Sequence, residues 1–392
     1  PSVEVAKKLN IEICELKIHK DQPEGLFDLF DNKSDYLLPN ENDEALVLHT
    51  SGTTSRPKIV PLSNNNIYSS SENISKSLSL TDNDHCLNIM PLFHIHGLIA
   101  VLATSMKVGA SVCASSGFNA LKFLDLARLE KITWYSGVPT MHQAILLRAN
   151  KNKEAAKNLN LRLIRSSSAS LPPAVFKDLN DAFNCPVIEA YGMTEATHQM
   201  TSNPLPPKQQ KAGFVGLPAG PEVCIMSENG DIMKQGEEGE VCIKGENVTL
   251  GYENNEEANK TSFTNGWFRT GDQGYFDEDG YLKISGRLKE IINKGGEKIS
   301  PLEVDNVLMD HPSIDQAVCF GYEDKMLGEN IASAIIIKSG EMCSEEDVLK
   351  YAQEKLAKFK IPKKIFFVDE IPKGATGKLQ RNVLAKKFGL SS

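Results

Sequence analysis

Short apolar runs alternate with amphipathic stretches from residue 44 to residue 190. The apolar runs have the length and composition of buried strands, and they cover 45–49, 86–90, 111–114, 132–135, 161–165 and 187–190. The stretches between them have helical spacing, at 64–78, 97–107, 120–129, 140–149 and 172–183. This alternation predicts an α/β fold of layered sheets, with a mostly parallel sheet covered on both faces. In such sheets, ligands gather at the carboxyl ends of the strands.

The rest of the chain differs in texture. The first 43 residues are polar, with a helix expected at 3–9 and a strand at 11–16. After the Pro-Leu-Pro-Pro sequence at 204–207, glycine and asparagine turns predict a β-rich subdomain over about 208–285, with strands at 223–226, 240–244 and 281–284. A small α+β domain is expected over 290–392, with helices at 301–309 and 345–356 and strands at 317–321 and 331–337. The sequence therefore predicts a large domain over 1–285 and a smaller C-terminal domain.

Composition and charge exclude several classes of protein. The 392 residues are 41% hydrophobic and 24% charged, which is typical of a globular chain and not of a disordered or fibrous one. The formal net charge of −8 argues against a broad nucleic-acid-binding face. No run approaches the roughly 18 apolar residues of a membrane span. We therefore expect a cytoplasmic protein with no nucleic-acid partner.

The strongest local signal follows the strand expected at 45–49. Residues 50–58 read Thr-Ser-Gly-Thr-Thr-Ser-Arg-Pro-Lys, a loop dense in hydroxyl and backbone donors that ends on a cation. Such a loop can surround phosphate oxygens, and Lys58 adds a point charge. The pattern is not GxxxxGK[ST], so it disfavours an ordinary P-loop NTPase. A plain Ser/Thr turn before a helix is the alternative.

The loop resembles the phosphate-binding loop of the adenylate-forming superfamily, which includes acyl-CoA synthetases, luciferase and peptide-synthetase adenylation domains. Four further blocks resemble the superfamily in the expected order: Tyr-Gly-Met-Thr-Glu at 191–195, Trp-Phe-Arg-Thr-Gly-Asp at 267–272, Gly-Arg-Leu-Lys-Glu at 286–290, and Pro-Lys-Gly-Ala-Thr-Gly-Lys at 372–378. The resemblance covers essentially the whole chain. Ser55 departs from it, because most members carry glycine there. Members also carry a longer region before the loop, so we expect residues 1–392 to be a fragment.

The resemblance implies a reaction and its cofactors. A carboxylate attacks the α-phosphorus of ATP with Mg²⁺ present, and coenzyme A then displaces AMP from the acyl-adenylate. A hinge at 286–289, centred on Lys289, is expected to let the C-terminal domain rotate between these two steps. The implied partners are a small carboxylic acid, ATP and CoA.

The resemblance also assigns residues. Lys378 is expected to bridge carboxylate and phosphate; Thr194 to contact the α-phosphate; Glu195 to hold Mg²⁺; and His94 to line the acyl pocket entrance as a further catalytic residue. Tyr191 is expected to stack on adenine, and Asp272 to bind the ribose. The expected cofactor-binding residues are Thr50, Ser51, Gly52, Thr53, Thr54, Ser55, Lys58, Ser168, Ala169, Ser170, Glu189, Ala190, Tyr191, Gly192, Met193, Asp272, Arg287, Lys289, and, toward CoA, Gly295 and Gly296. Without the other blocks, Lys378 would be taken for a solvated lysine and Arg287 for part of an interdomain ion pair.

The resemblance also bears on the acid substrate. Within the superfamily the chain is most similar to the oxalate–CoA ligase group, through residues 49–58, 93–97, 168–171, 194–198 and 295–301. Oxalate has a second carboxylate, which an apolar pocket would penalise. Hydroxyls at Ser168 and Ser170 and imidazoles at His96 and His198 are expected to hydrogen-bond this carboxylate, and a protonated histidine would offset its charge. The alternatives are that these residues serve adenine or packing, and that the acid is medium-chain or 4-coumarate-like. A luciferase-like monooxygenase, a carrier-protein adenylation domain and a non-catalytic nucleotide-binding homologue are further alternatives.

Overall fold

The computed structural model describes residues 2–11, 13, 17–18, 27–28, 39–50, 58–374 and 377–390. The chain divides into two units, 1–40 and 41–392. In the first, α1 (Ser2–Lys8) agrees with the expected helix, and β1 (Lys17–Ile18) pairs with β2 (Phe27–Asp28). The strand expected at 11–16 is absent at Ile11 and Ile13, and its other positions lie outside the described residues. None of the described helices is long and apolar enough to cross a membrane.

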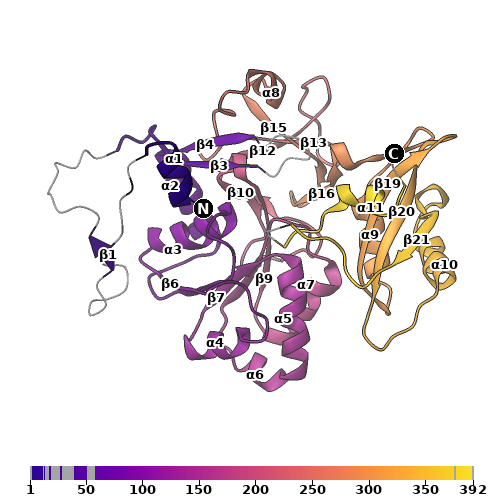
Figure 1. Cartoon of the computed structure of the whole chain (residues 1–392), viewed down its shortest axis with the longest axis horizontal. Helices are drawn as coiled ribbons and strands as arrows, with labels where there is room; N and C mark the ends of the chain where they lie inside the picture. Colours follow the sequence, from indigo (N-terminus) through magenta and orange to yellow (C-terminus); the bar gives the residue numbers. More distant parts are fainter. Residues whose placement is uncertain are drawn as a thin grey trace. The chain divides into compact units, whose positions relative to one another are not determined.

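A seven-stranded sheet lies at the centre of the second unit, with the strand order β11-β10-β9-β8-β7-β5-β6 (Figure 1). Its strands are β5 (His85–Asn88), β6 (Ser111–Ala114), β7 (Trp134–Gly137), β8 (Leu163–Ser166), β9 (Val187–Met193), β10 (His198–Ser202) and β11 (Leu217–Pro218). Strands β5 to β9 run parallel, and β10 and β11 are antiparallel. The α/β fold class expected from the alternation is therefore confirmed.

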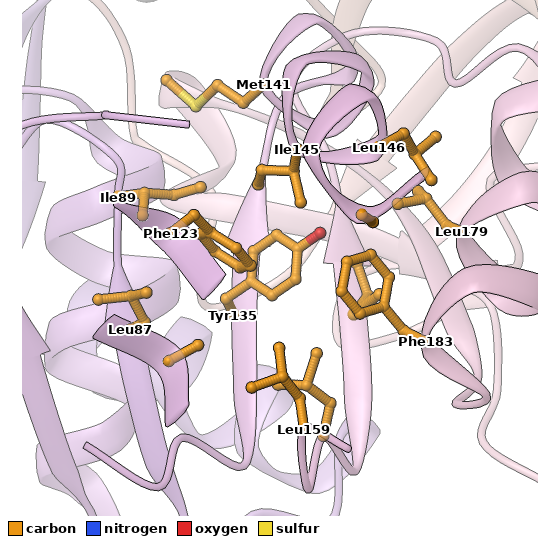
Figure 2. Close-up of a cluster of buried hydrophobic side chains, with 14 of the residues drawn as sticks. Leu87, Ile89, Phe123, Tyr135, Met141, Ile145, Leu146, Leu159, Leu179 and Phe183 are labelled. Atoms are coloured by element: carbon orange, nitrogen blue, oxygen red, sulfur yellow. The ribbon is translucent and has the colours of Figure 1, made fainter. Parts of the chain in front are cut away.

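Helices cover both faces of this sheet. One face packs on α4 (Phe123–Leu129), α5 (Pro139–Lys151), α6 (Lys153–Lys157) and α7 (Pro173–Phe183), and the other on α2 (Asn64–Ser77) and the π-helix η1 (His96–Ala103), which continues into α3 (Thr104–Lys107). Adjacent strand residues point to opposite faces: Tyr135 joins the α5–α7 core shown in Figure 2, and Trp134 the α2 core. Each such fully buried large apolar side chain contributes about 1.5–3 kcal/mol.

The strand expected at 45–49 is placed differently from the prediction. Strand β3 (Glu44–His49) pairs antiparallel with β4 (Ile59–Ser63) in a separate two-stranded sheet. The cause is the short connection at 50–58, since a parallel pair requires a crossover of a dozen or more residues. No residue of this strand is buried: Leu46 and Leu48 are partly exposed, and the other four are exposed, with Val47 at 44%.

The β-rich subdomain contains a sheet of β12 (Glu222–Met226), β13 (Gly239–Lys244), β14 (Phe263–Thr264), β15 (Trp267–Phe276) and β16 (Leu282–Arg287), with α8 (Glu256–Ser262) preceding β14. Strand β15 was not predicted, and Asp272 lies within it. Gly271 has a φ of 74°, and the pairing register of β15 with β16 shifts between Gln273 and Gly274. The strand is therefore irregular at its glycines, and in sequence such glycines are also typical of a turn.

The C-terminal sheet consists of β17 (Ile292–Lys294), β18 (Glu297–Ile299), β19 (Ile314–Asp324), β20 (Gly328–Ile337) and β21 (Lys364–Phe367). The accompanying helices are α9 (Pro301–Met309), α10 (Glu345–Lys355) and α11 (Leu384–Lys387), with short turns η4 (Lys358–Lys360) and η5 (Arg381–Val383). These elements agree with the expected α+β unit. The turn η3 (Leu288–Glu290) connects β16 to this sheet, so the expected hinge falls at the junction. Its mobility stays a prediction.

Candidate active site

Polar side chains gather where the parallel strands end, as the fold predicts. His94 and His96 follow β5, Ser136 lies on β7, and Ser168 follows β8. His96 begins the π-helix η1, a rare element that often occurs at functional sites. His198 is supplied by the antiparallel strand β10.

Two histidines form the centre of this cluster. His96 contacts Ser136 Oγ through Nε2 at 2.6 Å and Ser168 Oγ through Nδ1 at 3.1 Å. The rings of His96 and His198 lie 4.9 Å apart, centroid to centroid. Burial lowers the pKa of both imidazoles well below the usual value, and the nearby Arg165 guanidinium acts in the same direction. Both rings are therefore neutral near pH 7, which corrects the expectation that a protonated histidine supplies positive charge here.

Arg165 supplies that charge instead, and the sequence analysis did not single it out. Its side chain is completely buried on β8. Its Nη2 lies 3.4 Å from His198 Nδ1 and donates to Gln199 Oε1 at 3.2 Å, while Nη1 donates to Ser136 Oγ at 3.5 Å. Burial lowers the pKa of the guanidinium to about 9, so it is mostly charged at pH 7. The sequence did contain a signal for it, because an arginine within an otherwise apolar predicted strand indicates a buried charge.

The backbone around the cluster is strained. Ser168, Thr197 and His198 have positive φ angles of 72°, 48° and 98°, which residues with a side chain seldom adopt. Gly192 on β9 lies directly against His198, since a Cβ at residue 192 would be 1.8 Å from the His198 carbonyl oxygen. Such strain is typical of functional sites, where surrounding contacts hold it in place.

A second group of side chains surrounds Asp272. Its carboxylate is buried, and it accepts hydrogen bonds from the Tyr191 hydroxyl at 2.5 Å and from Arg287 Nε at 2.9 Å. Burial is the main cause that raises the pKa of Tyr191, and the charge of Asp272 raises it further. The same charge is the main cause that raises the pKa of Arg287. Three residues expected around the nucleotide thus lie in direct contact.

Glu195 lies in the turn η2 (Thr194–Ala196), beside the expected phosphate contact Thr194. Its buried carboxylate accepts a 2.8 Å hydrogen bond from the Tyr252 hydroxyl. Lys58 Nζ lies 4.1 Å from the centre of the Tyr252 ring, a cation–π contact. Burial lowers the pKa of Lys58, Glu195 raises it and Lys289 lowers it, so these charges share one region. Tyr252 could not be found from sequence, because no local pattern marks it.

Lys378 connects the two groups. Its pKa is lowered to about 8, chiefly by burial and then by Arg287, while Asp272 and Glu195 raise it. The same ammonium lowers the pKa of His94, His96 and His198. The lysine therefore lies electrostatically between the expected nucleotide residues and the histidines.

The other expected residues are placed as follows. The Glu189 carboxylate is buried, accepts from the Leu171 amide at 3.0 Å and has a pKa raised to about 8 by burial. His94 Nδ1 accepts from the His96 amide at 3.2 Å, and burial lowers its pKa to about 4. Ala190 is buried on β9, and Met193 is the last residue of that strand. Ala169 and Ser170 follow β8 and are exposed, and Gly295 and Gly296 form the turn between β17 and β18. The Thr50 amide donates a 2.9 Å hydrogen bond to the Lys58 carbonyl oxygen. Ser51, Gly52, Thr53, Thr54 and Ser55 lie outside the described residues.

The donor set fits a phosphate-bound magnesium ion better than a resident metal. Within the described ranges, no group of three His, Cys, Asp or Glu side chains can hold a metal by itself. Mg²⁺ commonly binds through one or two carboxylates plus substrate phosphates and water. Glu195, a carboxylate beside Lys58, is suited to that arrangement.

Comparison with known proteins extends these observations to the whole chain. Residues 4–253 match the model of the AMP-binding enzyme family, and residues 303–378 match that of the AMP-binding enzyme C-terminal domain. The chain is 50% identical over 355 residues to an oxalate–CoA ligase of Arabidopsis thaliana, covering 90% of this chain and 69% of that protein. It is 49% identical over 353 residues to an oxalate–CoA ligase of Saccharomyces cerevisiae, covering 90% of this chain and 64% of that protein. The chain thus spans about two thirds of the length of these relatives.

Solved structures agree with the fold. ATP-bound MatB from Rhodopseudomonas palustris superimposes with a TM-score of 0.84 at 32% identity, covering 89% of this chain and 69% of that one. The o-succinylbenzoate CoA synthetase of Bacillus subtilis, in complex with the acyl-adenylate intermediate OSB-AMP, gives 0.78 at 34% identity, covering 88% and 69%.

Proposed function

This chain belongs to the AMP-binding enzyme family, and we propose that it is an ATP-dependent acid–CoA ligase whose acid is oxalate. The family match and the relatives named CoA ligases confirm the AMP-forming ligase class expected from the motifs. One observation supports the site assignment: the charges of Glu195 and Asp272 act on Lys378, and the charge of Lys378 acts on the histidine cluster.

The first step joins two anions. A carboxylate oxygen of the acid bonds to the α-phosphorus of ATP, and the bond to the departing pyrophosphate breaks. Lys378 would stabilise the negative charge shared by the carboxylate and the α-phosphate, and Lys58 would offset charge on the other phosphates. Mg²⁺ held at Glu195 would neutralise further phosphate charge.

The nucleoside end of ATP would bind at the Asp272 group. Asp272 can accept from ribose hydroxyls beside its bonds to Tyr191 and Arg287, because each carboxylate oxygen accepts more than one hydrogen bond. Tyr191 would contact adenine through its ring while its hydroxyl stays on Asp272. The effect of these contacts is to fix the α-phosphorus next to Lys378.

The second step forms the thioester. The CoA sulfur bonds to the acyl carbon, and the bond from that carbon to AMP breaks. Gly295 and Gly296, with φ of 62° and 94°, would let the backbone of their turn approach CoA once the C-terminal domain has rotated about Lys289.

Oxalate is favoured over a fatty or aromatic acid by the polarity of the acyl side. The cluster around His96 consists of imidazoles, hydroxyls and a buried guanidinium, whereas a long acyl chain requires an apolar slot. The two relatives at 49–50% identity, both named oxalate–CoA ligases, support the same acid.

The test is pyrophosphate release with oxalate, malonate, octanoate and 4-coumarate, each with and without CoA. We expect kcat/KM for oxalate to exceed that for the other acids by at least about tenfold. A preference for octanoate or coumarate would contradict the oxalate assignment. Absence of pyrophosphate release with every acid would favour a non-catalytic homologue.

A further inference from the structure

Arg165 is a buried cation without a counter-ion. Its side chain has no solvent exposure, and its partners within the described part of the chain are Ser136, His198 and Gln199, none of them a carboxylate. Burying an ionised group costs several kilocalories per mole unless an opposite charge compensates it. No such charge enters the causes of its pKa shift, which burial alone produces.

Two nitrogens at this place also lack partners. Arg165 Nε and His198 Nε2 are fully buried, and neither makes a hydrogen bond in the structure. Buried polar atoms are normally satisfied, so an unsatisfied donor beside an uncompensated cation indicates a missing acceptor. An anion with carboxylate oxygens would supply both the charge and the acceptors.

Two cations act on the histidine pair. Both Arg165 and Lys378 lower the pKa of His96 and of His198, whereas the charges that act on Lys378 are those of Arg287, Asp272 and Glu195. Arg165 contacts His198 directly, and His198 packs on His96, so the guanidinium adjoins the histidine pair. A short dianion can place one carboxylate at Lys378 and the other toward Arg165.

We propose that Arg165 binds the second, unreactive carboxylate of the acid and thereby selects a short dicarboxylate over a monocarboxylate. This inference rests on the function proposed above. The guanidinium contributes the compensating charge. Neutral His198, whose Nε2 has no partner among the described residues, contributes a hydrogen bond, and His96, held by Ser136 and Ser168 through its two ring nitrogens, packs against His198. His94 keeps the role expected for it at the entrance of the pocket.

The test compares oxalate with oxamate, in which an amide replaces one carboxylate. With the full-length protein, pyrophosphate release should give a kcat/KM for oxalate about 10- to 100-fold above that for oxamate, because only the dianion compensates Arg165. Arg165→Gln retains amide donors for Gln199 and Ser136 but removes the charge. It should lower oxalate kcat/KM by a similar factor, mostly through KM, and bring the oxalate-to-oxamate ratio close to one.

Arg162→Gln is the matched control. Arg162 lies three residues earlier and pairs with Asp84 at 3.0 Å, so its loss should leave the oxalate-to-oxamate ratio unchanged. If Arg165→Gln fails to fold, the wild-type ratio alone decides, and equal use of oxalate and oxamate overturns the inference. Another outcome is a wild type that prefers oxalate and an Arg165→Gln variant that keeps the same oxalate-to-oxamate ratio of kcat/KM. That result overturns the role of Arg165 and leaves the proposed function intact. A wild type that uses only monocarboxylates overturns both.

Discussion

The Thr140 hydroxyl donates a 3.0 Å hydrogen bond to the carbonyl oxygen of Gly377, 237 residues further along the chain. Gly377 has φ 81°, and a Cβ there would lie 3.4 Å from Thr140 Oγ1 and from Val138 Cγ2. The start of α5 therefore holds the loop that carries Lys378 by direct contact.

Thr140→Val should slow adenylation about fivefold, because a hydrogen bond of this kind contributes about 1 kcal/mol. The measurement is the rate of oxalate-dependent pyrophosphate–ATP exchange, with thioester formation from supplied oxalyl-adenylate followed in parallel. Thr261→Val, at an exposed position on α8, is the control and should change neither rate. An equal loss in both half-reactions would contradict a role specific to this docked arrangement.

Lys378→Ala should reduce adenylation by about 10²- to 10³-fold, since it removes the cation placed between carboxylate and phosphate. Attack of CoA on supplied acyl-adenylate should remain nearly intact. Lys373→Ala changes an exposed lysine of the same loop and should leave both steps close to wild type. Equal loss of both half-reactions in Lys378→Ala would show that the lysine is needed in both conformations.

Lys289→Pro should slow thioester formation about tenfold or more while leaving adenylation largely intact. Proline fixes φ and removes an N–H in η3, the turn between the two sheets, and so hinders rotation of the C-terminal domain. Lys289→Ala keeps the backbone free and separates the loss of charge from the loss of flexibility. Unchanged thioester formation in the proline variant would refute the hinge.

Sequence reasoning succeeded where structure depends on local patterns. Short apolar runs separated by stretches of helical spacing located strands β5 to β9, since burial on both faces of a parallel sheet makes each strand a nearly continuous apolar run. It failed at β15, whose internal glycines resemble a turn, and at β3, where pairing depends on a loop. The contacts Tyr252–Glu195 and Arg165–His198 join residues 57 and 33 positions apart, and no local pattern encodes them.

Adenylation should fall as the pH rises through about 8, the lowered pKa of Lys378, because the reaction needs the charged ammonium. The measurement is kcat/KM for pyrophosphate–ATP exchange between pH 6.5 and 10 without CoA, whose thiol titrates in the same range. In the unfolded chain this lysine keeps its usual pKa of 10.5. Between pH 8 and 10.5 the unfolded chain therefore binds more protons, and the contribution of this group to the free energy of unfolding rises with pH.

Loss of activity in that range would therefore not reflect destabilisation by this group, and circular dichroism at each pH checks that the protein stays folded. Lys378→Arg is the control, because the ordinary pKa of a guanidinium lies well above that of an ammonium, so that arginine keeps its charge where the lysine loses it. Whatever activity this variant retains should not fall near pH 8. A wild-type profile that stays flat to pH 10 would show that the ammonium charge of Lys378 is not required for adenylation.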